Sequence, residues 1–99
     1  MRIGVVKGMI VSTQKSENLV GTKLLIVEEI DSTGKKSGKD EVAVDLFGAG
    51  IGETVLLCHG SPARAILSNP AAPVDLVVVG IIDSIETASG STKTGKGQL

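Results

Sequence analysis

Short runs of branched aliphatic residues, separated by polar stretches rich in glycine, make up the pattern of this chain. Five of these runs have the length and the Val, Ile and Leu content of β-strands. They span residues 2–13, 23–30, 41–46, 54–60 and 74–83. No internal repeat relates them to one another. The pattern predicts an all-β domain.

Three glycine positions and one alternation make this prediction specific. A glycine inside a strand often marks a bend, so the first strand is expected to bend at Gly8. In the polar loop 31–40, Gly34 and Gly38 are expected to have positive φ angles. The third strand alternates, which predicts one set of side chains facing inward and another facing outward. The inward set is Val42, Val44 and Leu46, and the outward set is Ala43 and Asp45.

One short helix is expected between the fourth and fifth strands, over residues 61–67. Ser61 is a suitable N-cap, and Pro62 at the first helical position costs no hydrogen bond. The stretch 68–73, SNPAAP, ends this helix. Five strands with a helix in this place predict a small five-stranded OB-like β-barrel.

The barrel domain is expected to cover residues 1–85, followed by a C-terminal tail over residues 86–99 that is rich in Gly, Ser, Thr and Lys. From Ser89 onward this composition is typical of a flexible linker. The loop 14–22 is also polar. The fifth strand and the second strand are apolar on both faces, whereas a lone barrel shields only its inner face. We therefore expect their outer faces to pack against copies of the same chain.

Composition excludes several classes of function. The 99 residues carry a net charge of −1, and Phe47 is the only aromatic residue, so neither a basic footprint nor a stacking surface for nucleic acid exists. The single cysteine, Cys58, excludes an intrachain disulfide and fits a reducing compartment. The apolar runs are too short to span a bilayer, and the N-terminus reads as a strand rather than a signal peptide.

Two glycine-rich motifs partly match nucleotide-binding patterns, but the residues that follow them do not fit. Gly90–Lys96 has the spacing of a phosphate-binding loop, but Gly97 follows and no helix comes after it. The GAGIG turn at 48–52 lacks a third glycine at the dinucleotide-binding spacing, and a strand follows it.

Cys58 and His59 are the only soft metal ligands, too few for a structural zinc site within one chain. Adjacent residues of a strand also point to opposite faces, which does not suit a Cys–His nucleophile pair. We therefore expect no catalytic residue, no metal and no cofactor. Arg64, between two alanines on the short helix, is suited to bind a carboxylate or backbone carbonyls across a subunit contact.

Several motifs together resemble one family. They are D-x-x-G-A-G-x-G-E-x-V-L-L at 45–57, G-S-x-A-R at 60–64 and P-V-D-L-x-V-x-G-I-x-D at 73–83. K-L-L-x-V at 23–27 and G-x-V-x-S-T, which opens at Gly8, are similar as well. In order and spacing the chain resembles the EutN/CcmL family of bacterial microcompartment vertex proteins up to about Ile85.

The resemblance implies a small OB-like barrel that assembles into cyclic homopentamers. These close the corners of a polyhedral protein shell in the cytoplasm, and unrelated hexameric shell proteins build its flat facets. Such shells enclose metabolic enzymes, as in carboxysomes or ethanolamine and propanediol compartments. Family members are structural proteins and not enzymes. A hexamer, or a monomeric OB-like module that binds a small polymeric ligand, is the alternative.

The resemblance and the glycine turn together indicate where assembly takes place. The turn is expected near the fivefold axis, where copies crowd and side chains must be small, so it is the candidate rim of a pore; its residues are Gly48, Ala49, Gly50 and Ile51. The candidates for the contact between subunits are Ser61, Arg64, Glu53 and Asp45. Pro62 stands where the family commonly has a second serine, which removes a hydroxyl and an N–H from this corner.

Overall fold

The computed structural model describes residues 1–11, 23–67 and 74–93 of the chain. The predicted loop 14–22, the helix-ending stretch 68–73 and the tail beyond residue 93 lie outside the described residues. Within these limits the structure tests each predicted strand and the predicted helix.

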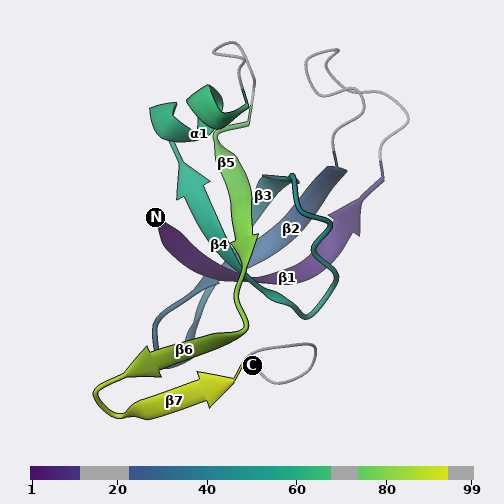
Figure 1. The fold of residues 1–99 in the computed structure, drawn as a ribbon. Helices are drawn as coiled ribbons and strands as arrows, with labels where there is room; N and C mark the ends of the chain where they lie inside the picture. The colour runs from purple at the N-terminus through teal and green to yellow at the C-terminus, as the bar shows by residue number, and fades with distance from the viewer. Residues whose placement is uncertain (12–22, 68–73, 94–99) are drawn as a thin grey trace.

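Five strands close into a barrel in the order β1-β2-β3-β5-β4, with β1 paired to both β2 and β4 (Figure 1). Neighbouring strands are antiparallel except β3 and β5, which run parallel. The strands are β1 (Arg2–Ile10), β2 (Lys23–Ile30), β3 (Lys36–Asp45), β4 (Thr54–His59) and β5 (Leu76–Ile81). The predicted five-stranded barrel with one helix between β4 and β5 is confirmed.

The bend and the turn glycines of the barrel also agree with the sequence. The β1–β2 register shifts between Val6 and Gly8, which is a bulge at the expected place. Gly34 and Gly38 have φ angles of 90° and 83°. Gly38 lies inside β3 rather than in a loop, because β3 begins at Lys36 and not at residue 41.

The core has two layers, built from alternating residues of the same strands. The barrel interior holds one cluster, and its members are Val6, Leu25, Val27, Ala43, Ala49, Val55, Leu57, Leu76 and Val78. A second cluster contains residues that are next in sequence to members of the first, together with one residue of the helix. Its members are Leu24, Val44, Cys58, Ala63 and Val77. The outer apolar face of β5 is thus partly covered by the chain's own helix, and Leu24 of β2 joins the same cluster. That copies of the chain cover the rest of these faces stays a prediction.

The predicted facing of the third strand is wrong. Ala43 is fully buried in the barrel interior, whereas Val42 and Leu46 are 42% and 50% exposed. Asp45, expected to face outward, is also buried. A carboxylate can face inward at low cost when hydrogen bonds satisfy it, and hydrophobic alternation alone does not register those bonds.

The helix α1 (Ser61–Ile66) lies within the predicted range, but its N-cap is one residue earlier than expected. The N-cap is Gly60 and not Ser61, and no side-chain hydrogen bond caps the helix. Gly60 has φ 75°, a conformation that favours glycine, and its carbonyl accepts the Arg64 N–H at 3.2 Å. Pro62 is the second residue of the helix rather than the first, and it still lies in the first turn.

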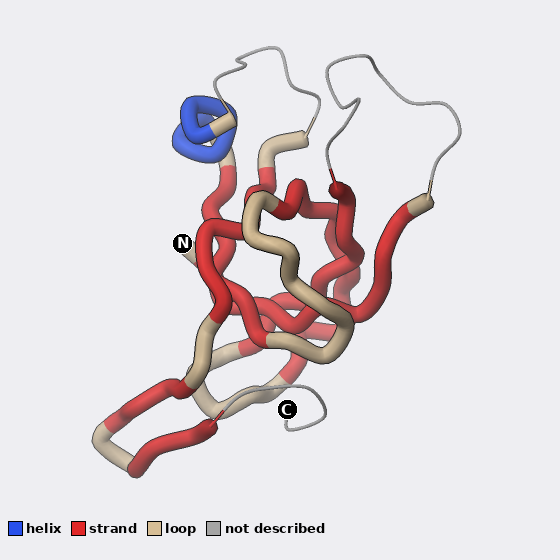
Figure 2. The backbone as a smooth tube through the Cα atoms, turned by 45° about the vertical axis from the view of Figure 1, so that its right-hand side comes forward, coloured by secondary structure: helices blue, strands red, loops and turns tan. Residues whose placement is uncertain are grey.

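A small hairpin follows the barrel. The strands β6 (Ser84–Thr87) and β7 (Gly90–Lys93) form a separate two-stranded antiparallel sheet that projects from the barrel (Figures 1 and 2). The expectation of a flexible linker from Ser89 is therefore wrong for the stretch up to Lys93. Composition suggested a linker because β7 contains no apolar residue.

Candidate functional site

The glycine loop at 46–53 joins β3 to β4, and one buried carboxylate organises its first half. Asp45 Oδ1 accepts the N–H groups of Phe47 and Gly48 at 2.9 and 3.2 Å. Its Oδ2 accepts the N–H of Ala49 at 2.8 Å. The Asp45 side chain is 0% exposed, so these bonds form away from solvent. Charge-assisted bonds of this kind fix the turn rather than merely permit it.

Lys23 supports the same turn from the neighbouring strand. Lys23 on β2 is paired with Asp45 on β3 in the sheet register. Lys23 Nζ donates to the Ala49 carbonyl at 3.1 Å and lies 3.6 Å from Asp45 Oδ2. The buried carboxylate therefore has a cation beside it, which offsets part of its desolvation.

The second half of the loop is attached to β1. Glu53 Oε1 accepts the Gly50 N–H at 2.6 Å, and the Glu53 N–H donates to the Gly50 carbonyl at 3.1 Å. Gly52 N–H donates to the Val6 carbonyl at 2.8 Å, and Val6 N–H donates to the Glu53 carbonyl at 2.9 Å. The loop that joins β3 to β4 is thus hydrogen-bonded to β1, and its Ala49 side chain joins the interior cluster.

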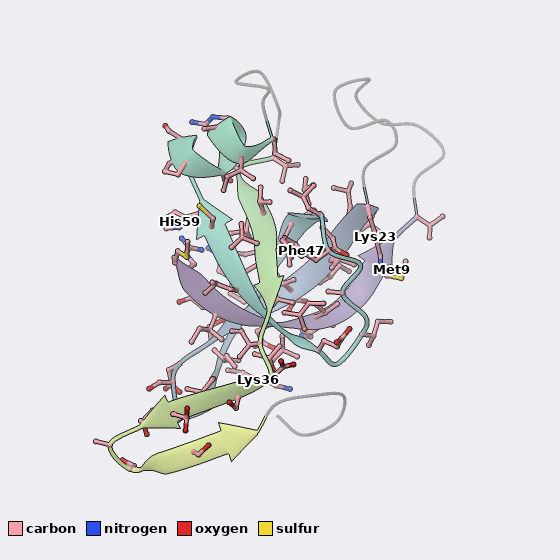
Figure 3. The ribbon with its side chains drawn as sticks, viewed as in Figure 1. Met9, Lys23, Lys36, Phe47 and His59 are labelled. Atoms are coloured by element: carbon pink, nitrogen blue, oxygen red, sulfur yellow. The ribbon has the colours of Figure 1, made fainter. Side chains whose placement is uncertain are left out.

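The residues predicted to lie at a fivefold axis differ in their exposure. The Ala49 side chain is fully buried in the barrel, so it does not line an opening, which corrects one part of the prediction. Ile51 is 55% exposed, and Phe47, next to the predicted set, is 56% exposed (Figure 3). Gly48 is exposed with φ 79°. That the loop surrounds an axis stays a prediction.

The helix corner presents the other two predicted interface residues. Ser61 is exposed and Arg64 is half-buried on α1. Arg64 Nη2 donates to Ser61 Oγ at 3.3 Å, and no ion pair to Arg64 is present among the described residues. Gly60 N–H donates to the Asp75 carbonyl at 2.8 Å, which anchors the start of the helix.

The four predicted interface residues therefore differ in what their side chains do within the chain. Asp45 and Glu53 hold the glycine loop in place. Ser61 and Arg64 lie at the surface and contact each other. The assignment of all four to a subunit contact stays a prediction, and the last two are better placed for it.

Sequence reasoning missed the exposed apolar residues. Phe47 and Ile51 lie in the glycine loop, and Leu46 precedes them at 50% exposure. Others lie on strands and on the helix, namely Met9, Val42, Ile66 and Ile81. Large exposed apolar side chains that gather on a small protein mark interaction surfaces. The available signal was Leu46-Phe47, two large apolar residues beside a glycine turn.

Ion pairs cover another part of the barrel surface. Arg2 Nη1 contacts Glu41 at 3.0 Å, and its Nε lies 3.5 Å from Glu29. Lys7 Nζ donates to Asp40 at 2.8 Å and lies 3.4 Å from Glu28. The hydrogen bond with Asp40 raises the pKa of Lys7 above its ordinary value. These pairs join β1, β2 and β3.

The other candidate ligands do not come together. Cys58 is buried in the helix-side cluster, and His59 is exposed at the end of β4 (Figure 3). In the described ranges no group of three or more His, Cys, Asp or Glu side chains could hold a metal ion. None of the helices in the described ranges has the length and apolarity needed to cross a membrane.

Comparison with known proteins identifies the family. Residues 1–83, the whole barrel, match the family described as ethanolamine utilisation protein EutN/carboxysome. The chain belongs to the EutN/CcmL family. The predicted resemblance is confirmed, and with it the expectation of a structural shell protein rather than an enzyme.

Three similar proteins show how far the likeness extends. The carboxysome shell vertex protein CcmL of Synechocystis sp. is 47% identical over 92% of this chain and 91% of its own. A solved CcmL structure from Nostoc sp. superposes with a TM-score of 0.84, at 44% identity, over 96% of this chain and all of its own. The pentameric microcompartment shell protein GrpN of Rhodospirillum rubrum has a TM-score of 0.79, at 43% identity, over 89% of this chain and all of its own.

Proposed function

We propose that this EutN/CcmL chain forms homopentamers that occupy the vertices of a bacterial microcompartment shell, where hexameric facet proteins surround them. The match over the whole barrel to a family of shell vertex proteins carries this proposal. A structurally similar relative is a pentameric shell protein, which supports five copies rather than six.

Geometry gives the physical reason for the number of copies. A flat lattice of hexagonal tiles closes into a polyhedron only when fivefold corners are added. A ring of five copies uses one heterologous contact repeated around an axis until it closes. The exposed Phe47 and Ile51 supply apolar surface for such contacts.

In this ring we place the glycine loop at the axis and the helix corner at the contact between neighbours. Asp45 and Glu53 support the first placement indirectly, because they hold the loop in one conformation. Arg64 supports the second, because within the described residues its five-donor guanidinium bonds to Ser61 alone. Ile51, rather than the buried Ala49, is the residue to substitute when the axis is probed.

Co-assembly with a hexameric facet protein tests the vertex function. With the full chain present, we expect closed polyhedral particles in electron micrographs. Without it, we expect open sheets or tubes, because hexagons alone cannot close. Closed particles of equal yield in both preparations would contradict the proposal.

The Arg64 contact has a matched test. The Arg64→Ala substitution is expected to raise the concentration at which pentamers dissociate by about tenfold, as the loss of a charge-assisted contact predicts. His59→Gln, at the exposed end of the strand that precedes the helix, serves as the control and is expected to leave dissociation unchanged. An unchanged Arg64→Ala pentamer would remove Arg64 from the interface.

A further inference from the structure

The hairpin β6–β7 stands apart from the rest of the chain. In the described residues, every barrel strand packs against its neighbours, whereas β6 and β7 pack only against each other. An open groove of about 320 Å³ separates the hairpin from the β2–β3 turn. Its lining residues are Ser32, Thr33, Thr87, Ser89, Gly90 and Ser91. The hairpin and the barrel thus face each other across hydroxyl groups and not across a packed apolar contact.

The hairpin has little to stabilise it alone. Its ladder runs from the pair Ser84–Lys93 to the pair Thr87–Gly90, and Ile85 is the one large apolar residue in the two strands. The turn adds weak bonds, with Ser89 N–H donating to Thr87 Oγ1 at 3.2 Å. A single two-stranded hairpin is at best marginally stable in water. A partner surface is needed to hold it in one place.

The likeness to a related structure extends into the hairpin segment. The Nostoc CcmL structure superposes over 96% of this chain, so the match must include most of the segment from Ser84 to Lys93. Because no strand or helix of its own barrel packs against the hairpin in the described residues, we expect the surface that holds it to belong to another molecule.

From these observations we infer that the β6–β7 hairpin is an assembly arm that packs against a neighbouring copy of this chain in the pentamer. The inference rests on the proposed function, which supplies such a neighbour at a fixed place. The barrel is closed, whereas both edges of the hairpin are open strand edges. Ile85 is half-buried within its own chain and can complete its burial against that copy.

Photo-crosslinking from the hairpin tests this arm directly. The native Cys58 is buried, so a Glu86→Cys substitution adds one exposed thiol that a benzophenone maleimide can label. After irradiation of the full-length oligomer, we expect the main product to be two chains joined, with a yield that does not change on tenfold dilution. Unsubstituted protein, treated in the same way, controls for labelling at Cys58.

The outcomes separate this inference from the proposed function. A pentamer that yields only crosslinks within one chain, mapped by peptide mass spectrometry, overturns the arm and leaves the pentamer standing. If native mass spectrometry of the same sample shows no pentamer, the proposed function fails and the arm fails with it.

A substitution pair gives an independent readout. The Ile85→Ser substitution is expected to raise the dissociation concentration of the pentamer by about tenfold, as loss of a buried aliphatic side chain predicts. Glu86→Gln, at the exposed neighbouring position, is expected to leave it unchanged. Equal dissociation of both variants and the parent protein would overturn a role for Ile85 in the arm.

Discussion

Two segments of this protein that contain turn glycines differ in what holds them. The loop 46–53 is fixed by Asp45, Lys23 and Glu53 and contributes Ala49 to the core. The hairpin from Ser84 to Lys93 packs on no strand or helix of the barrel among the described residues. The first segment is therefore part of the fold of one chain. The second depends on what surrounds the chain.

The largest expected effect comes from the carboxylate that organises the loop. Asp45→Ala removes the acceptor for three N–H groups and leaves Lys23 beside an apolar side chain. We expect the free energy of unfolding to fall by about 3 kcal/mol, since buried donors are left unsatisfied. Urea unfolding at fixed chain concentration measures it. Asp83→Ala, at an exposed position, is the control, and an equal loss in both variants would contradict the account.

A smaller effect is expected at the other end of the loop. Glu53→Ala removes the 2.6 Å bond to the Gly50 N–H, which we expect to lower the free energy of unfolding by about 1.5 kcal/mol. Glu86→Ala in the hairpin, with an exposed side chain, is expected to change it by less than about 0.5 kcal/mol. Unfolding curves for the two variants, recorded together, test the contrast; equal shifts would refute it.

Two glycines sharpen the comparison further. Gly48 has φ 79° and Gly90 has φ 133°, and an added Cβ would meet no atom within 4 Å at either position. Backbone strain alone therefore decides the effect of Gly→Ala. In the loop we expect a loss of about 1 kcal/mol of barrel stability, since the strain is coupled to the core. In the hairpin we expect barrel unfolding to be unchanged, because local opening relieves the strain. Chemical unfolding that reports on the barrel distinguishes them.

The smallest effect concerns a third turn, which an exposed carboxylate holds. Asp31 Oδ1 accepts hydrogen bonds from the Thr33 hydroxyl and from the N–H groups of Thr33 and Lys35. These bonds lower the pKa of Asp31, and the bond from the Thr33 hydroxyl has the largest effect. Because the pKa of Asp31 is lower in the folded state, its ionised carboxylate stabilises the fold above the ordinary pKa of about 4. This stability is lost as the pH falls through the pKa of the folded state. In the Asp31→Asn variant, the free energy of unfolding should therefore fall less steeply as the pH is lowered. An identical fall in both proteins would exclude this contribution.

Hydrophobic periodicity was enough to predict the architecture. The apolar run at 23–30 predicted β2 with its observed bounds, and the bend at Gly8 was also found. The motif at 45–57, together with two others, was specific enough to indicate the family. These features depend on local residue type and spacing, which the sequence states directly.

The remaining errors share one physical cause, which is that hydrogen bonds and turn contacts outside the hydrophobic pattern decide them. Asp45 faces inward because Lys23 and the backbone N–H groups of the loop satisfy it. Ala49 is buried because the loop returns to Val6. The hairpin forms from residues whose composition is that of a linker. Neither alternation nor composition contains this information.

Native mass spectrometry of the full-length chain tests the central claim most directly. Five copies of the 10.1 kDa chain should appear as one species of about 50 kDa. The account predicts this pentamer as the dominant mass at micromolar chain concentration. A dominant monomer or hexamer would contradict it.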